Sequence, residues 1–191
     1  MSQMTLMSQR LTVIELTNQT TSLAGSIPGR NLLAKLIESV KSPTVPSPVF
    51  LDFAGVESAT ASYLRESVMG FRDYCLRSRL PLYAVVANAH PDIIEELEIV
   101  LAAENDAILA CSLSPENDAT AVRIFGPLDH TQRITLDEVS KRGQVDAITL
   151  SQTSDEVGST AWNNRLVALA GKGLVIEEKK GRGKYYRPVV E

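Results

Sequence analysis

Val49-Phe50-Leu51-Asp52-Phe53 is a nearly uninterrupted apolar run with the length of a β-strand. A strand that faces solvent on one side alternates apolar and polar residues, whereas a run of this kind suits a strand covered on both faces. Gly55 follows as a turn signal. The segment from Leu82 to Val86 has the same character, and Ala107 to Leu113 is a candidate for another strand. These runs predict a mixed or mostly parallel sheet.

Apolar residues at helical spacing lie between the strand candidates and predict crossover helices. The three helical segments run from Pro28 or Gly29 to Ser42, from Thr60 or Ser62 to Leu76, and from Pro91 to Leu101. Residues 11–16 precede them and predict an edge strand. An order in which strands and helices alternate is typical of an α/β domain with helical connections.

Ser114-Pro-Glu-Asn-Asp118 interrupts every periodic pattern and predicts the region of a domain boundary. We expect residues 1–117 to form the α/β domain and residues 118–191 to form a second domain. Residues 122–125 favour a strand that leads across the boundary.

The second half predicts three helices followed by a hairpin, which is an α+β arrangement. The helices are expected at residues 128–142, 147–152 and 159–171, with Asp146 and Ser159 as N-caps of the second and third. In the first helix, Ile134, Leu136 and Val139 are expected to face inward, and in the third, Trp162, Leu166 and Leu169 share one face. Gly181-Arg-Gly183 predicts the turn of the hairpin.

The segment Thr160-Ala-Trp-Asn-Asn-Arg-Leu166, with Gly173-Leu-Val175, Gly181-Arg-Gly183 and Tyr186-Arg-Pro188, resembles winged helix-turn-helix transcription regulators. The resemblance runs from about Leu128 to the end of the chain. It implies that residues 159–172 form a recognition helix and residues 177–186 a wing. Such domains usually act as dimers, because one module makes too few contacts for specific affinity, so we expect a homodimer.

The residues expected to contact DNA fall into two groups. Small polar side chains at the start of the recognition helix suit base edges, and cations on the wing suit phosphates. They are Ser159, Thr160, Asn163 and Asn164 in the first group, and Lys179, Lys180, Arg182, Lys184 and Arg187 in the second. Acidic residues weaken the positive field and leave open a module that docks only proteins. They are Asp155, Glu156, Glu177 and Glu178.

The segment Val49-Phe-Leu-Asp-Phe-Ala-Gly-Val56, followed by Ser62-Tyr-Leu-Arg-Glu66, resembles STAS-like domains, the family that includes bacterial anti-anti-sigma factors. The resemblance covers about residues 11–113, and Gly29-Arg30 at a helix start is similar to the uncharacterised branch of that family. It implies a protein-interaction or sensor domain whose partner is an ATPase or kinase of the anti-sigma type. The contact would lie around residues 60–65.

Anti-anti-sigma factors carry a phosphorylated serine at the start of this helix, and by spacing that position corresponds here to Ala61. Thr60 and Ser62 are hydroxyl residues on either side of it, and Arg65 follows in the first turn. We therefore keep Thr60, Ser62 and Arg65 as candidates for a protein-interaction surface or a phosphorylation switch. The alternative is that Ser62 is an ordinary N-cap.

Composition places limits on function. The net charge is −4, distributed as −5 over residues 1–126 and +1 over residues 127–191, so DNA binding requires a local cationic patch. No nucleotide-binding or hydrolase motif is present, and the two histidines and two cysteines have no metal-ligand spacing. No apolar run approaches the ~20 residues that cross a membrane. We expect no catalytic residue, metal or cofactor, and a cytoplasmic location.

These observations lead to one expectation and two alternatives. The expectation is a bacterial regulatory protein that binds DNA through its C-terminal domain and a partner or signal through its N-terminal domain. The first alternative is a protein-interaction adaptor in which both domains dock proteins. The second is a small enzyme, which would require a deep pocket with converging polar groups.

Overall fold

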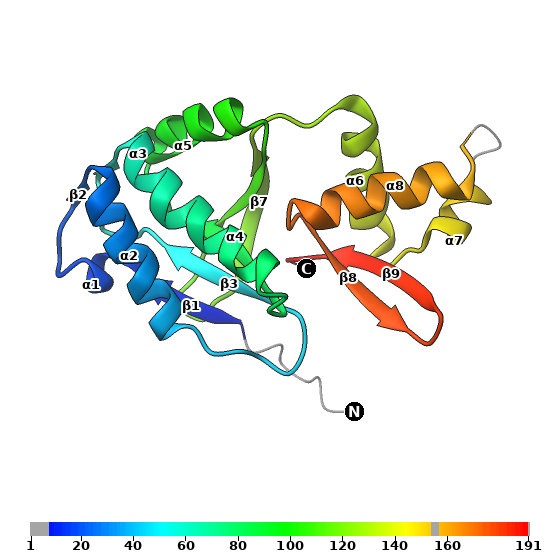
Figure 1. The fold of residues 1–191 in the computed structure, drawn as a ribbon, viewed down its shortest axis with the longest axis horizontal. Coiled ribbons are helices and arrows are strands. Elements are labelled where there is room, and N and C mark those ends of the chain that lie inside the picture. Colours follow the sequence, from blue (N-terminus) through cyan, green and yellow to red (C-terminus); the bar gives the residue numbers. More distant parts are fainter. Residues whose placement is uncertain (1–7, 154–156, 191) are drawn as a thin grey trace. The chain divides into compact units, whose positions relative to one another are not determined.

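The computed structural model describes residues 8–153 and 157–190 and has a mixed α/β fold. The chain divides into two compact units, Met1–Gly126 and Pro127–Glu191 (Figure 1). The elements of the first unit, in chain order, are β1 (Gln9–Thr12), α1 (Val13–Leu16), β2 (Ser22–Leu23), α2 (Ser26–Ser39), β3 (Ser47–Asp52), β4 (Ser58–Ala59), α3 (Ala61–Leu64), the π-helical segment η1 (Arg65–Met69), α4 (Gly70–Arg77), β5 (Leu82–Ala87), α5 (Pro91–Glu104), β6 (Ile108–Leu113) and β7 (Ala119–Phe125).

The main sheet of the first unit has the strand order β1-β3-β5-β6-β7 and is mostly parallel, as the sequence predicts. Only β7 runs antiparallel, beside β6. Each parallel connection moves to the next strand in the same direction along the sheet. Because such crossovers are right-handed, their helices collect on one face of the sheet. Among the described strands the order never reverses, so this sheet lacks the kind of switch point at which nucleotides bind in doubly wound folds.

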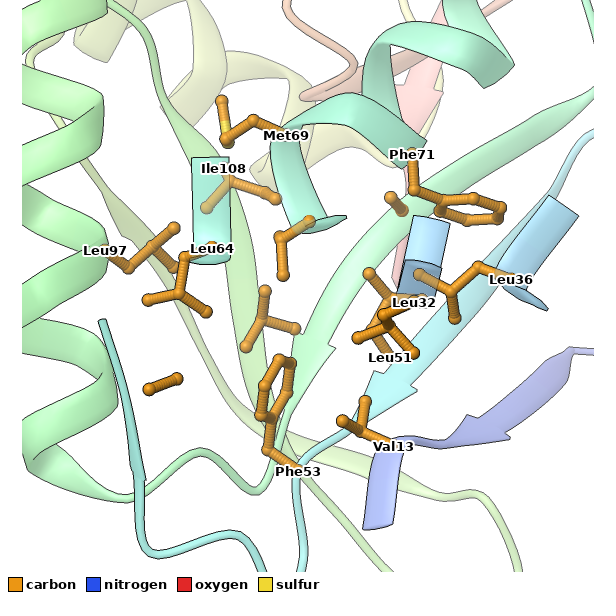
Figure 2. Packing of buried hydrophobic residues seen from close by; sticks show 14 of the residues in the cluster. Val13, Leu32, Leu36, Leu51, Phe53, Leu64, Met69, Phe71, Leu97 and Ile108 are labelled. Carbon is orange, nitrogen blue, oxygen red and sulfur yellow. The ribbon is translucent and has the colours of Figure 1, made fainter. Parts of the chain in front are cut away.

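The helix-covered face holds the core of the first unit. Leu51 of β3 and Ile108 of β6 point toward the helices, where they meet Leu64, Phe71 and Leu97 (Figure 2). All five side chains are fully or almost fully buried. Burial of a side chain of this size stabilises the fold by about 1.5–3 kcal/mol, so this layer holds the helices on the sheet.

The first strand is shorter than residues 11–16. It pairs with β3 at the sheet edge, with Leu11 opposite Leu51, which confirms the expected edge position. After Thr12 the chain turns into the single helical turn α1, which buries Val13 in the core. Val13 and Ile14 favour β-strands but lie in this helical turn, because burial in the core outweighs a weak local preference.

The second predicted helix begins at Ala61 and continues to Arg77, but it contains the π-helical segment η1. The bulge faces α2, where Gly29 approaches so closely that a Cβ atom there would lie 2.7 Å from the carbonyl oxygen of Tyr63. That carbonyl instead accepts a hydrogen bond of 2.7 Å from the Ser67 hydroxyl. The glycine therefore permits two helix backbones to pack closely at a point where the regular hydrogen-bond pattern changes.

The boundary between the two units lies after Gly126, not after residue 117. The residues from Ser114 to Asp118 form a hairpin turn, closed by a hydrogen bond of 3.0 Å from the Ser114 N–H to the Asp118 carbonyl. Strand β7 then returns along β6, with Phe125 opposite Ile108. Polar turn residues mark a hairpin as readily as a linker, which is why the sequence placed the boundary too early.

The second unit contains the helices and the hairpin that the sequence predicts. Its elements are α6 (His130–Arg142), α7 (Ala147–Ser151), α8 (Ser159–Gly171), β8 (Val175–Lys180) and β9 (Gly183–Pro188). Val145, between α6 and α7, forms an isolated antiparallel bridge with Tyr186 of β9. Trp162, Leu166 and Leu169 are buried as expected.

Two expectations about the helices of the second unit are wrong. Ile134 is 40% exposed, and its neighbour Thr135 is buried instead, with its hydroxyl bonded to the Thr131 carbonyl at 2.7 Å. The N-cap of α8 is Gly158 rather than Ser159, and glycine has no side chain that could accept from the first helical N–H groups. Asp146 does cap α7 by accepting from the N–H groups of Ile148 and Thr149.

Candidate functional site

Helix α8 presents a polar, uncharged end to solvent. Burial of Trp162 on the opposite side leaves Ser159, Thr160 and Asn164 exposed, whereas Asn163 is half-buried. The helix contains no Asp or Glu, and Arg165 is its one charged residue. Free N–H groups and a partial positive charge at a helix N-terminus favour anions, so this end combines donors with a favourable field.

Arg165 is a feature of α8 that sequence reasoning missed. Its guanidinium lies over the Trp162 ring, 5.1 Å from the ring centroid. Side chains three residues apart are neighbours on a helix surface, so the spacing of Trp162 and Arg165 could have predicted this contact from the sequence. The contact keeps one positive charge on α8 close to the polar residues at its start.

The hairpin of β8 and β9 carries the five predicted cations, but they differ in availability. Lys179 pairs with Lys184 across the two strands, and Gly181, with a φ of +63°, forms the turn together with Arg182. Lys179, Lys180, Arg182 and Lys184 are all exposed. The side chain of Arg187 is only 13% exposed, so it is the least accessible of the five.

Two glutamates on β8 neutralise much of this charge. Glu177 lies 2.9 Å from Lys184, and Glu178 lies 2.7 Å from Arg187 and 3.7 Å from Lys180. Lys179 and Arg182 have no ion pair with any residue in the ranges 8–153 and 157–190. The positive charge that a partner would meet is therefore concentrated at the tip of the hairpin.

The start of α6 holds a titratable cap. The Thr131 hydroxyl and the Gln132 N–H donate to the Asp129 carboxylate, and these hydrogen bonds lower the pKa of Asp129 from its ordinary value of 3.8. The Gln132 side chain accepts from the Asp129 N–H in return, which completes a capping box.

This cap predicts a pH-dependent contribution to stability. A carboxylate whose pKa is lowered on folding stabilises the folded state above its unfolded pKa, and the contribution disappears as the pH falls through the folded pKa. We expect Asp129→Asn to lower the urea midpoint of the second unit at neutral pH and to match the wild type at acidic pH. Fluorescence of Trp162, the one tryptophan, measures the transition. A difference that is constant with pH contradicts the prediction.

In the first unit, Ser62 is not the N-cap of α3. The cap position is Thr60, whose hydroxyl accepts from the Gly25 N–H at 3.2 Å and lies 3.2 Å from the Ser62 hydroxyl. The first helical N–H, that of Ala61, donates instead to the carboxylate of Glu96 on α5 at 2.7 Å. A side chain 35 residues away along the sequence therefore caps the helix.

Glu96 occupies the position where a phosphate on Thr60 or Ser62 would meet the helix N-terminus. A phosphate and the Glu96 carboxylate would repel each other there. The Ala61 N–H, which would otherwise favour a phosphate, already donates to that carboxylate. Thr60 and Arg65 are exposed and Ser62 is half-buried. The Glu96 carboxylate would therefore compete with a phosphate at this helix start.

The role of Glu96 predicts a measurable loss of stability. We expect Glu96→Ala to lower the free energy of unfolding by about 1 kcal/mol, because the Ala61 N–H loses its capping acceptor. Glu96→Gln, which keeps an acceptor oxygen, loses less. Glu98→Ala is the control, because Glu98 is exposed on the same helix. Urea unfolding measures all three, and equal effects of Glu96→Ala and Glu98→Ala contradict the assignment.

Asp52, at the end of β3, has a structural role. It is completely buried and forms an ion pair with Arg10 at 2.5 Å. The Ala54 N–H and the Asn88 side chain donate to its other oxygen at 3.1 and 2.8 Å. Asn88 also bonds to both backbone polar groups of Leu113. The carboxylate thus ties the ends of four neighbouring strands together, and its acceptor sites are used.

Several polar and reactive side chains of the first unit lie beside one cavity. A cavity of about 490 Å³ lies beside Asn88, Cys111, Ser112 and Arg123. Burial raises the pKa of the Cys111 thiol to about 11, so this thiol is protonated at neutral pH. His90 caps α5 by accepting from the Asp92 N–H at 3.4 Å.

Within residues 8–153 and 157–190, His, Cys, Asp and Glu nowhere gather in a group of three that would hold a metal ion. None of the helices in these ranges has the length and apolar character to cross a membrane. No family model matches the chain, and no curated protein matches it.

Proposed function

We propose that this protein is a cytoplasmic regulator whose second unit is a winged helix that binds DNA and whose first unit is a STAS-like domain that receives a signal or a partner protein. The order of elements in the second unit supports the proposal. A helix, a short bridging strand at Val145, two helices and a hairpin follow one another, and α8 corresponds to the recognition helix.

One observation carries the DNA-binding proposal: α8 exposes small polar residues and contains no carboxylate, and the hairpin of the same unit carries two cations, Lys179 and Arg182, that have no ion pair among the described residues. Thirteen residues make α8 about 20 Å long, and a helix is about 10–12 Å across, which fits a major groove about 12 Å wide. Thr160 and Asn164 lie one turn apart on the exposed side and are suited to base edges. Lys179 and Arg182 on the hairpin are suited to phosphates.

Salt-dependent binding tests the proposal. We expect the full-length protein to bind a fluorescent mixed-sequence duplex, with an affinity that falls at least tenfold between about 50 and 200 mM salt, because each phosphate contact releases counterions. Fluorescence anisotropy measures the binding. Heparin, a polyanion that competes for cationic surfaces, distinguishes sequence-specific binding from purely electrostatic binding. Absence of binding at about 50 mM salt would overturn the DNA-binding proposal.

A protein-interaction adaptor is the second candidate, and a specific observation favours it. Glu177 and Glu178 form ion pairs with three of the five hairpin cations and offset two of their charges. A surface with this mixture of signs suits a protein partner as well as a nucleic acid. An adaptor would show no DNA retention at low salt and would bring a partner protein with it during purification.

The first unit offers a surface for such a partner around Thr60, Ser62 and Arg65. Because Glu96 already caps α3, we propose that the partner contacts the hydroxyl groups directly, without phosphorylation. An ATPase or kinase of the anti-sigma type is the partner that the STAS-like resemblance implies. A homodimer remains our proposal for the DNA-binding form, because one winged helix makes few base contacts.

A further inference from the structure

A cavity of about 350 Å³ opens in the first unit between the segment that follows α1, the start of α2 and Tyr63 of α3. Its volume falls within the range of small-molecule sites. The cavity is distinct from the exposed surface at Thr60 and Arg65 and from α8 and the hairpin. Neither the proposed DNA contacts nor the proposed partner surface uses it.

Tyr63 gives this cavity an unusual polar group. The residue is 1% exposed and lines the cavity, and the hydrogen bonds of the described residues include none from its hydroxyl. The hydroxyl is not among the fully enclosed side-chain atoms that lack a partner, so it keeps some access to solvent and can donate to a ligand in the cavity. Burial raises the pKa of Tyr63 to about 12, so the hydroxyl stays protonated and acts as a donor toward the cavity.

The second polar feature is the positive charge of Lys35, which also lines the cavity. Its ammonium donates to the backbone carbonyl of Leu16 at 2.6 Å, which is a neutral partner. The described lining residues include no Asp or Glu, so no carboxylate in the cavity balances this charge. Asn31 and Thr17 add further side chains that can donate hydrogen bonds.

The rest of the wall is apolar and includes Leu16, Leu23, Leu32 and Pro28. A ligand that fits both parts has an anionic head for Lys35 and Tyr63 and an apolar body for the leucines. We propose that this cavity binds a small organic carboxylate, with Tyr63 and Lys35 holding its oxygens. The inference does not depend on whether the second unit binds DNA.

Such a ligand would act on the proposed partner surface through α3. Tyr63 directly follows Ser62, and its backbone packs against Gly29 of α2 and precedes the π-helical segment. A hydrogen bond at the Tyr63 hydroxyl therefore acts on the same helical turn that presents Ser62. The cavity gives the first unit a means of sensing a metabolite.

Hexanoate is a suitable probe, with hexylamine and 1-hexanol as matched controls of opposite and zero charge. In the full-length protein, we expect hexanoate at up to about 10 mM to shift the amide NMR signals of residues 16–35 and 63, and the two controls to shift them far less. Absence of these shifts, or equal shifts from hexylamine, overturns the proposal.

Variants identify the groups that hold the carboxylate. We expect Tyr63→Phe and Lys35→Gln each to weaken hexanoate binding about tenfold, because each removes a donor to a charged acceptor. Lys41→Gln, an exposed change of the same charge, is the control and leaves the affinity unchanged. Tyr63→Phe removes a hydroxyl without a protein partner, so its urea midpoint stays at or above that of the wild type. Wild-type affinity in both Tyr63→Phe and Lys35→Gln overturns the assignment.

Discussion

Replacing Lys179 and Arg182 together with glutamine is expected to weaken DNA binding by about 10- to 100-fold at about 0.1 M salt. These are the two hairpin cations that have no ion pair in the described parts of the chain. Their charge is therefore fully available to phosphates. The slope of the logarithm of affinity against the logarithm of salt concentration should fall by about two, one for each lost phosphate contact.

The paired cations should contribute less. Neutralising Lys184 leaves Glu177 without its partner at 2.9 Å, so the variant changes the local charge in two ways at once. Arg187 is largely buried against Glu178. Its replacement would disturb the hairpin itself, so a change in DNA affinity would not measure a direct contact with DNA. We therefore expect the order of effects on the salt slope to follow ion pairing in the hairpin rather than position in the sequence.

A matched control separates local contact from net charge. Lys41→Gln with Arg79→Gln removes the same two charges from exposed positions of the first unit. Fluorescence anisotropy with one duplex at several salt concentrations compares both double variants with the wild type. An equal loss of affinity in the two double variants would contradict a specific role of the hairpin tip.

Sequence reasoning identified the hairpin and its cations, but not which of them are paired. Glycines at 181 and 183 and the run of basic residues were enough to predict the turn and its charge. The pairing depends on cross-strand register, which places Glu177 opposite Tyr186 and brings Lys184 within reach. Side-chain contacts across strands are set by that register, which a charge count does not contain.

The sheet was predictable where strands are long and buried. β3 and β5 lie close to the apolar runs from which they were inferred, because burial on both faces leaves a continuous signal. The two-residue strands β2 and β4 were missed, since two residues are too few to show a period. The cap of α3 was assigned wrongly because its acceptor, Glu96, comes from another helix.

The largest effect on stability is expected at Gly126, and we expect Gly126→Ala to lower the free energy of unfolding of the first unit by about 3–4 kcal/mol. Gly126 has a φ of +94°, which costs an L side chain about 1–2 kcal/mol. A Cβ atom would also overlap the carbonyl oxygen of Asp106 and lie 3.0 Å from Leu101 Cβ. Neither neighbour is free to move, because one is backbone and the other is core.

Gly55→Ala is the matched control for the conformational part of this effect. Gly55 lies in the same unit and has a φ of +83°, but its nearest neighbour for a Cβ atom is Ile14 at 3.7 Å, an ordinary contact. We expect a loss of about 1 kcal/mol there, so the difference between the two variants measures the steric overlap at Gly126. Urea unfolding followed by circular dichroism measures both. Equal losses would mean that β7 does not end against Asp106, and that the sheet's fifth strand is held more loosely than its pairing with β6 implies.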